Sequence, residues 1–331
     1  MPIKNIWITY SQEILENQEK SYYKTRSELK GKTLTMIEEA LQEAGWEVNK
    51  ISVDLPLPQL TEFFSQKIDL IFNLTICVSG IYNQAFLPLL LDANNIPYLG
   101  SNSVVHSLCL DRSLSKLCLR GIGIPTPSYF IWSSKEEIPE NLDFPLIIKP
   151  RFRSHQEIIS AQSVVSNQEE LERELQRVFS ETRDEVIAEK FLTGREMMIG
   201  IWGNGKSASP LPIMEVNVSR QVLLWDFQTK NDKGYVEDVL CPAPLSEEQK
   251  NQIEKMALKI FQELHMRDYA TFKLIFSEKE EIPFFFELNS LPSLYYRHSA
   301  FPEMCNASGI DYKTMVQKLA RIAEERVARK L

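Results

Sequence analysis

Cysteine and glycine are both scarce in this chain of 331 residues. The five cysteines are odd in number and have no two-residue pair spacing, so the sequence predicts neither a disulfide framework nor a zinc site. A reducing cytoplasm is therefore the expected location. The 12 glycines form no G-x-G-x-x-G motif after the first expected strand, which argues against a dinucleotide-binding oxidoreductase.

A surplus of basic residues and long apolar runs are also missing. The formal net charge of -8 argues against nonspecific nucleic-acid binding, which needs a basic face. The longest apolar stretch, residues 85–91, contains Pro88 and is followed by Asp92, and the first residues are too short an apolar segment for a signal peptide. We therefore expect a globular protein without a membrane segment, long enough to build two or three cores.

Hydrophobic patterning predicts alternating strands and helices in the first third of the chain. Strands are expected over residues 3–10, 46–53, 68–74 and 97–99. An amphipathic helix carrying Leu34, Ile37 and Leu41 lies between the first two strands and ends at Gly45. This β-α-β order predicts a parallel sheet.

Capping signals mark helices further along the chain. Ser166 with Glu169 predicts a capping box at the start of a polar helix, and Ser246 with Gln249 predicts another. A last helix is expected from about Tyr312. These helices alternate with apolar strand-like runs, which favours mixed α/β units after the first sheet.

The most informative motif is an apolar run over residues 284–289 that ends in Glu287, Leu288 and Asn289. On a strand, residues i and i+2 point to the same side, so Glu287 and Asn289 are predicted to project together. Oxygen ligands of this kind hold Mg²⁺ against nucleotide phosphates. The alternative is a strand end that exposes two polar residues to water.

Two upstream runs place lysines at the ends of expected strands. Residues 144–150 end in Lys149 and a proline, and residues 186–192 repeat the pattern with Glu189 and Lys190. The two lysines are predicted to converge on polyphosphate charge, while the backbone after Lys190 offers amide and carbonyl groups to a base edge. A single lysine at a strand end is typical of a solvated surface, so only the ordered set of motifs indicates a nucleotide site.

In this order the motifs resemble those of the ATP-grasp superfamily, and within it the D-alanine–D-alanine ligase-like proteins. The resemblance follows Ile71–Leu74, Ile96–Ser101, Asp111 and Arg112 with Lys116, Gly123–Pro127, Lys149 and Pro150, Glu189–Leu192, Cys241–Ala243, Arg267–Ala270 and Glu287–Asn289. It implies an α/β ATP-grasp fold. A Rossmann-like parallel-sheet domain over residues 1–110 would precede two α+β subdomains, 111–190 and 191–331, that enclose the nucleotide.

The resemblance also implies an activity, that of a carboxylate–amine ligase that uses ATP and Mg²⁺ and passes through an acyl phosphate. Matching positions imply phosphate contacts for Arg112, Lys149 and Lys190, and an adenine site at Glu189, Lys190, Phe191 and Leu192. They also imply that Glu196 contacts the ribose and that Lys230 is a lysine of the mobile loop. Glu287 and Asn289 would be the metal ligands. Catalysis in such a site depends mainly on positioning and on neutralising phosphate charge.

Two departures from the family pattern affect the phosphate region. The family's Arg-x-Asp aligns with Thr271 and Lys273, so an ammonium replaces a metal-binding carboxylate. Either Lys273 replaces a metal charge directly, or phosphoryl transfer is lost. The family's glycine-rich loop aligns with residues 151–158, which contain no glycine. There Arg151, Arg153 or His155 would supply side-chain donors in place of backbone amides, or the loop is an ordinary exposed one.

Departures in the first unit make D-alanine a poor candidate substrate. The expected Glu-Gly is Ile76-Cys77 and the expected Arg-Glu is Asn83-Gln84, which leaves an amino acid or small peptide of another kind. Arg297 and Ser299 are expected to face the acceptor and, with Lys230 and Lys273, are the catalytic candidates. Arg297 would pair with a substrate carboxylate, or else form a structural ion pair.

Two functions of different classes remain open at this level. The first is a divergent ATP-dependent carboxylate–amine ligase. The second is a catalytically degenerate ATP-grasp protein that binds nucleotide or a partner without ligase turnover. Related folds often dimerise through the N-terminal unit, so a homodimer is a candidate assembly that the sequence itself does not determine.

Overall fold

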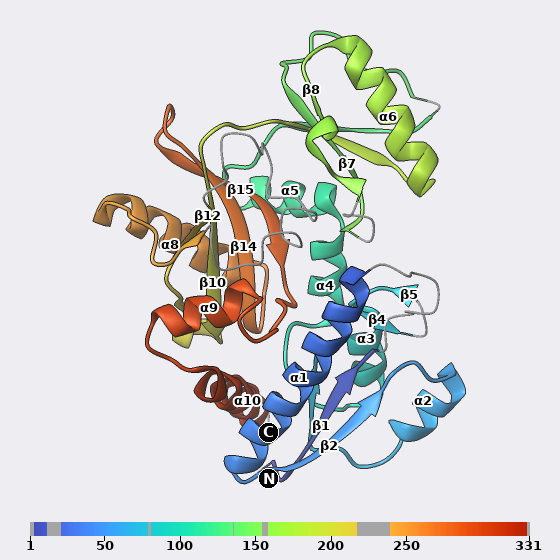
Figure 1. Cartoon of the computed structure of the whole chain (residues 1–331), viewed down its shortest axis with the longest axis vertical. Helices are drawn as coiled ribbons and strands as arrows, with labels where there is room; N and C mark the ends of the chain where they lie inside the picture. The colour runs from blue at the N-terminus through green and yellow to red at the C-terminus, as the bar shows by residue number, and fades with distance from the viewer. Residues whose placement is uncertain are drawn as a thin grey trace.

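The computed structural model describes residues 3–11, 21–78, 81–134, 136–153, 158–216 and 239–329. The chain forms a parallel sheet near its N-terminus and two larger antiparallel sheets further on (Figure 1). No helix within these ranges is both long and apolar enough to cross a bilayer. The α/β class expected from the sequence is confirmed.

The N-terminal sheet has the order β2-β1-β3, with all neighbouring strands parallel. Its elements are β1 (Asn5–Tyr10), α1 (Ser21–Glu43), β2 (Glu47–Ser52), α2 (Leu57–Phe63), β3 (Leu70–Asn73), β4 (Cys77–Val78), β5 (Ile81–Tyr82), α3 (Phe86–Ala93) and α4 (Ser103–Leu110). The strand predicted at 97–99 is reduced to a single parallel bridge between Ile71 and Tyr98. The predicted β-α-β order is otherwise confirmed.

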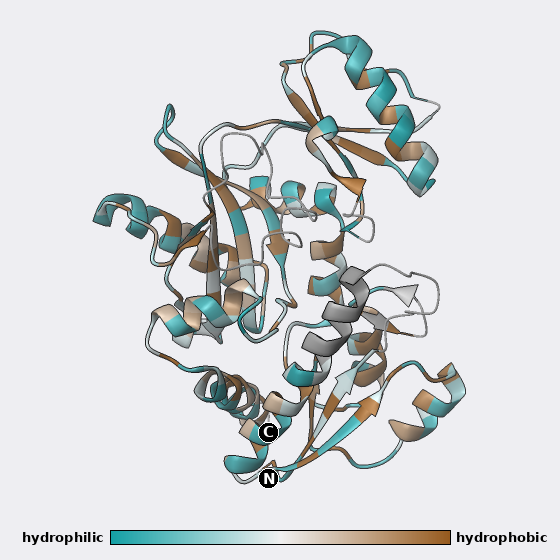
Figure 2. Ribbon diagram, in the orientation of Figure 1, coloured by the Kyte–Doolittle hydropathy of each residue, from teal (hydrophilic) through white to brown (hydrophobic). Residues whose placement is uncertain are grey.

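The central unit is a sheet of order β6-β9-β7-β8 covered by one helix. It contains β6 (Tyr129–Trp132), β7 (Leu146–Pro150), β8 (Val164–Val165), α6 (Gln168–Thr182) and β9 (Val186–Lys190). The preceding helix, α5 (Arg112–Gly121), packs beside β15 (Ile282–Asn289) of the last sheet. Leu171, Leu175 and Val178 of α6 are buried against the sheet, while the outer face of α6 is hydrophilic (Figure 2).

The capping box predicted for α6 is wrong by one residue. Asn167 is the N-cap, and its side chain accepts a hydrogen bond from the backbone N–H of Glu170. Ser166 instead donates its backbone N–H to the Glu170 carboxylate. Asn and Ser cap helices about equally well, so the local pattern alone did not separate the two positions.

The last unit is built on a sheet of order β13-β12-β10-β14-β15, with β11 added beside β10. Its elements are β10 (Arg195–Gly203), β11 (Ser209–Pro210), β12 (Met214–Val216), β13 (Val239–Leu240), α8 (Glu247–Glu263), β14 (Asp268–Ser277), β15 (Ile282–Asn289), α9 (Ala300–Ala307) and α10 (Tyr312–Ala328). The predicted capping box of Ser246 and Gln249 is confirmed at the start of α8.

Strand β10 is buried on both faces. Met197, Ile199 and Ile201 pack into the core formed with α8, whereas Met198 and Trp202 face the core formed with α9 and α10. The second of these cores also takes in the N-terminal sheet, because α10 lies beside α1 (Figure 1). The two ends of the chain therefore share one hydrophobic core.

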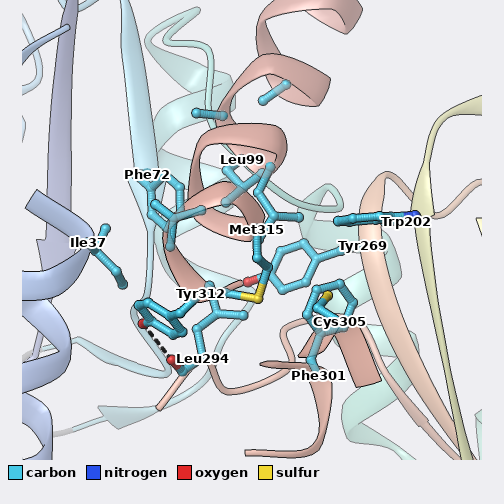
Figure 3. Close-up of a cluster of buried hydrophobic side chains, with 14 of the residues drawn as sticks. Ile37, Phe72, Leu99, Trp202, Tyr269, Leu294, Phe301, Cys305, Tyr312 and Met315 are labelled. Atoms are coloured by element: carbon cyan, nitrogen blue, oxygen red, sulfur yellow. Dashed lines mark hydrogen bonds between the residues drawn. The ribbon is translucent and has the colours of Figure 1, made fainter. Parts of the chain in front are cut away.

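Figure 3 shows the residues that join the two ends of the chain in this core. Ile37, Phe72 and Leu99 of the first unit lie near Met315 and Tyr269 of the last. The Tyr312 hydroxyl donates a hydrogen bond of 2.7 Å to the Leu294 carbonyl, so its one polar group is satisfied inside the apolar cluster. The domain boundaries at 110/111 and 190/191 stay predictions.

Gly194 connects the central sheet to β10 at a point with no room for a side chain. Its φ is +152°, and a Cβ there would lie 2.3 Å from the Phe276 carbonyl oxygen.

We expect Gly194→Ala to lower the free energy of unfolding by about 1–3 kcal/mol, measured by urea denaturation. Gly31→Ala, where nothing lies within 4 Å, is the control and should be neutral or stabilising by up to about 1 kcal/mol. Equal effects would contradict the steric argument.

Candidate functional site

Glu189, at the end of β9, lies between two lysines from neighbouring elements. Lys149 of β7 is paired with Ile187, so in the antiparallel ladder it emerges on the same face as Glu189. Its Nζ lies 3.1 Å from Glu189 Oε2, and Lys116 Nζ of α5 lies 3.0 Å from Oε1. The side chains of Glu189 and Lys116 are 1% and 0% exposed, so this is a buried ion pair.

Burial and charge act in opposite directions on these groups. Burial by itself would raise the pKa of Glu189, but the positive charges of Lys116 and Lys149 outweigh it and hold the pKa at about 2. Burial lowers the pKa of Lys116 to about 8, although Glu189 opposes the shift. Both groups are therefore ionised at neutral pH, and each charge depends on the other.

Glu287, near the end of β15, is also held by two cations. Lys273 is its direct partner across the β14–β15 ladder, and Lys273 Nζ lies 3.4 Å from Glu287 Oε1. Arg153, which follows β7, places Nη2 3.1 Å from the same oxygen and donates from Nη1 to the Leu288 carbonyl at 2.8 Å. The three side chains are 12–16% exposed.

The two carboxylate groups belong to one continuous arrangement. Lys116 Nζ donates a hydrogen bond of 3.0 Å to the carbonyl of Phe286, the residue before Glu287. Lys149 Nζ lies 5.4 Å from the centre of the Phe286 ring. Here we call Lys116, Lys149, Arg153 and Lys273, with Glu189 and Glu287, the cationic cluster. Its cations outnumber its carboxylates by two, at the junction of the central and last sheets.

Lys190 does not converge with Lys149, contrary to the prediction. Consecutive strand residues point to opposite faces, so Lys190 projects away from Glu189 and Lys149. Its Nζ pairs with the Asp143 carboxylate at 2.8 Å and donates to the Phe144 carbonyl at 2.9 Å. The sequence pattern makes the two strand ends look equivalent, but only one lysine lies on the face of the cationic cluster.

The predicted adenine and ribose residues lie at the connection from β9 to β10. The backbone N–H of Lys190 donates to Ser128 and that of Phe191 donates to Pro145, so both amides serve the sheet. Leu192 follows and is partly buried, and Glu196 on β10 is also partly buried. Their nucleotide roles stay predictions.

Arg112 is almost fully buried and contacts the backbone at the end of β7. Its Nη1 donates to the carbonyls of Pro150 and Phe152 at 2.8 and 2.9 Å. Arg151 pairs with Asp111 at 2.7 Å and with Glu185. Of the arginines considered as phosphate donors, Arg153 is therefore the one that joins the cationic cluster. His155 lies outside the described residues.

Glu287 and Asn289 share one face of β15, as their spacing predicts, but their contacts do not fit a divalent metal. Asn289 Oδ1 accepts the backbone N–H of Leu291 at 3.1 Å, and Glu287 Oε1 is contacted by two cations. Among the residues that the structure describes, no three His, Cys, Asp or Glu side chains come together as metal ligands. The residues present do not match the oxygen-rich shell that Mg²⁺ prefers.

The residues predicted near the acceptor are arranged around the start of α9. Ser299 is 5% exposed, accepts the Tyr295 backbone N–H at 3.1 Å and donates to Ser293 Oγ at 2.9 Å, so its hydroxyl organises the turn. The Arg297 guanidinium lies 5.1 Å from the Tyr296 ring centre, in cation–π contact. Lys230 lies outside the described residues.

A buried polar group beside the end of β15 was not predicted from the sequence. His106 Nδ1 lies 2.7 Å from Ser290 Oγ, and Gln84 Nε2 donates to the same oxygen at 3.3 Å. Burial lowers the pKa of His106 to about 4, so the imidazole is neutral at physiological pH. The sequence offered Arg153 only as one of three alternative phosphate donors and gave Lys116 no role, and the contacts of Lys116 with Glu189 and of Arg153 with Glu287 were not predicted because they depend on residues distant in sequence.

Comparison with known proteins identifies a family that matches most of this chain. Residues 122–321 match the family described as D-ala D-ala ligase C-terminus. Relatives include an uncharacterised protein, y4sG, of Sinorhizobium fredii, 25% identical over 89% of this chain and 88% of its own length. D-alanine–D-alanine ligase A of Bacillus cereus is 30% identical over 69% of this chain and 72% of its own length.

Solved structures show the same architecture. The D-alanine–D-alanine ligase of Bacillus anthracis complexed with ATP superposes with a TM-score of 0.74 at 21% identity, over 99% of both chains. The VanG D-Ala:D-Ser ligase of Enterococcus faecalis gives a TM-score of 0.75 at 18% identity, over 97% of this chain and 99% of its own. The fold is thus that of the ATP-grasp ligases. Within that class, this chain belongs to the D-alanine–D-alanine ligase family.

Proposed function

We propose that the protein is an ATP-dependent ligase that joins a carboxylate to an amine through an acyl phosphate. The cationic cluster carries this proposal, because it gathers Lys149, Arg153 and Lys273 at the junction of two sheets in the fold of this family. A structural neighbour, the Bacillus anthracis ligase, is described as complexed with ATP, which supports nucleotide as the anion that binds here.

The chemistry of the reaction needs positive charge of this kind. A carboxylate anion is a poor electrophile until one oxygen becomes a phosphate leaving group. Negative charge on the transferring phosphoryl group must then be neutralised while donor and acceptor are held in line. Lys149, Arg153 and Lys273 supply that charge in a partly dehydrated site, where it acts more strongly than in water.

The acceptor of the proposed reaction is an amino acid or small peptide other than D-alanine. Gln84, at a position where the family pattern has a charged anchor, is buried and donates to Ser290. An amide cannot form the ion pair with a substrate ammonium or carboxylate that a charged side chain forms. VanG, which has this fold and is described as a D-Ala:D-Ser ligase, supports a second substrate other than D-alanine.

A second candidate function is favoured by one observation. The Glu287 carboxylate is already neutralised by Lys273 and Arg153, which leaves a site that binds phosphate charge but does not fit the expected metal. Such a site suits a catalytically degenerate protein that binds nucleotide without turnover. The two functions differ in whether ATP is consumed.

Release of ADP over a panel of amino acids and dipeptides separates the two functions. For the ligase, we expect ADP release to depend on a carboxylate substrate, and hydroxylamine to trap the acyl phosphate as a hydroxamate. Lys149→Met should lower kcat/KM by about 10²-fold, with circular dichroism to verify folding. Lys279→Met, an exposed lysine in the turn after β14, should have no effect. ATP binding without ADP release would favour the second function, and no ATP binding would contradict both.

A further inference from the structure

The charges of the cationic cluster bear on whether the site needs a divalent cation. The inference drawn from them rests on the proposed binding of ATP. We infer that Lys273 and Arg153 bind the phosphate chain of the nucleotide directly, and that no divalent cation is held at Glu287. The two side chains thereby supply, from the protein itself, the positive charge that a bound metal ion would supply.

The first support is the geometry at Glu287. One oxygen of its carboxylate, Oε1, lies within 3.1 Å of Arg153 Nη2 and 3.4 Å of Lys273 Nζ. A magnesium ion bound to that oxygen would sit at about 2.0–2.1 Å from it. It would therefore be placed beside a guanidinium and an ammonium, which repel it at short range.

The second support is that the backbone fixes both cations in place. Lys273 is paired with Glu287 across the β14–β15 ladder, so its side chain necessarily emerges beside the carboxylate. Arg153 is anchored by a second hydrogen bond of 2.8 Å to the Leu288 carbonyl. The side chains of Arg153 and Lys273 are 12% and 16% exposed, so solvent screens their charges only a little.

The third support is the charge balance of the whole cluster. Glu189 is matched by Lys116 and Lys149, and Glu287 by Arg153 and Lys273, so positive charge is in excess at both carboxylates. A cluster with this excess attracts a triphosphate without help from a metal. The planar fork of Arg153 also suits bidentate contact with phosphate oxygens.

Calorimetric titration of the intact protein with ATP tests the inference, once in EDTA and once with excess magnesium. We expect the affinity for ATP in EDTA to equal or exceed that for the magnesium complex, because magnesium neutralises charge that the cluster would otherwise contact. Tightening by magnesium of about tenfold or more would overturn the inference. Lys273→Ala and Arg153→Ala should each weaken binding in EDTA by about tenfold, because each removes a charge-assisted hydrogen bond.

Lys279→Ala and Arg173→Ala are the matched controls, since both side chains are exposed and lie outside the cluster. They should leave the affinity unchanged. If they weaken binding as much as the cluster variants do, general surface charge explains the effect and the inference is wrong.

Manganese binding followed by electron paramagnetic resonance gives a readout that needs no nucleotide. We expect the wild-type protein to leave added Mn²⁺ free. The double variant Lys273→Asp/Arg153→Ala should bind it, because two carboxylates would then face each other across the ladder beside Asn289. Stoichiometric Mn²⁺ binding by the wild type would overturn the inference, as would a failure of ATP to bind under either condition.

The outcomes also separate this inference from the proposed ligase activity. Metal-independent ATP binding without ADP release would support the inference and contradict the ligase. ADP release from a protein whose ATP binding requires magnesium would support the ligase and overturn the inference.

Discussion

Replacing Glu189 with glutamine is expected to lower the free energy of unfolding by about 3–5 kcal/mol near neutral pH. The substitution keeps the size of the side chain but removes the negative charge between Lys116 and Lys149. Lys116 is fully buried, so its ammonium would be left without a compensating carboxylate. Urea denaturation of the variant and the wild type measures the difference.

The size of this loss should depend on pH. The pKa of Glu189 is about 2 in the folded protein against an ordinary value of 4.5, so the folded state favours the ionised carboxyl. Its contribution is fully present above the ordinary pKa and is lost as pH falls toward about 2, amounting to about 3 kcal/mol by linkage. The gap between wild type and Glu189→Gln should therefore shrink between about pH 5 and pH 2.

Two controls make this prediction specific. Glu140→Gln, which alters an exposed glutamate in the loop before β7, should change stability by less than about 0.5 kcal/mol. Adding Lys116→Met to Glu189→Gln should recover part of the loss, because the buried ammonium is removed as well. A destabilisation that is independent of pH, or that Lys116→Met makes additively worse, would contradict the ion-pair account.

Replacing Asp268 with asparagine should be about as costly, at about 3–5 kcal/mol of unfolding free energy. Asp268 is fully buried and accepts hydrogen bonds from Arg326 at 2.8 and 2.9 Å, from the Gly100 backbone N–H at 2.7 Å and from Asn204 at 2.8 Å. These donors come from the N-terminal unit, the end of β10 and α10. The carboxylate therefore ties three parts of the chain together.

The backbone at this position does not explain the expected loss. Asp268 has a φ of 64°, which asparagine adopts as readily as aspartate does, so only the charge and one acceptor change. Adding Arg326→Met should recover part of the stability through coupling between the two sites. Glu325→Gln is the matched control, because its ion pair with Arg329 spans 3.9 Å with both side chains about two-thirds exposed, and it should cost less than about 1 kcal/mol.

Much of the fold could be predicted because it follows from local periodicity. The alternation of β1, α1, β2 and β3 was readable from apolar spacing, and Ser246 with Gln249 marked the start of α8. The shared face of Glu287 and Asn289 follows from the period of a strand in the same way. The reduction of the strand at 97–99 to one bridge depended on neighbours distant in sequence, which local pattern does not contain.

The candidate site was only partly predictable, because its contacts depend on register. Lys149 and Lys190 look alike in sequence, yet the pairing of β7 with β9 sends one toward Glu189 and the other toward Asp143. Arg153 comes from an irregular segment whose contact with Glu287 spans 134 positions. No signal near Arg153 in the sequence indicates that contact.

The sequence by itself determined the class of this protein: the order of its strands and helices, the ligase-family motifs and the presence of Lys273 where the family pattern has a carboxylate. Only the tertiary structure decided which charges meet. The pairing of Lys273 and Arg153 with Glu287, and of Lys116 with Glu189, arises from strand register and sheet packing. Ionic interactions act through space over a few ångströms, so their partners are set by the folded chain and not by distance along it.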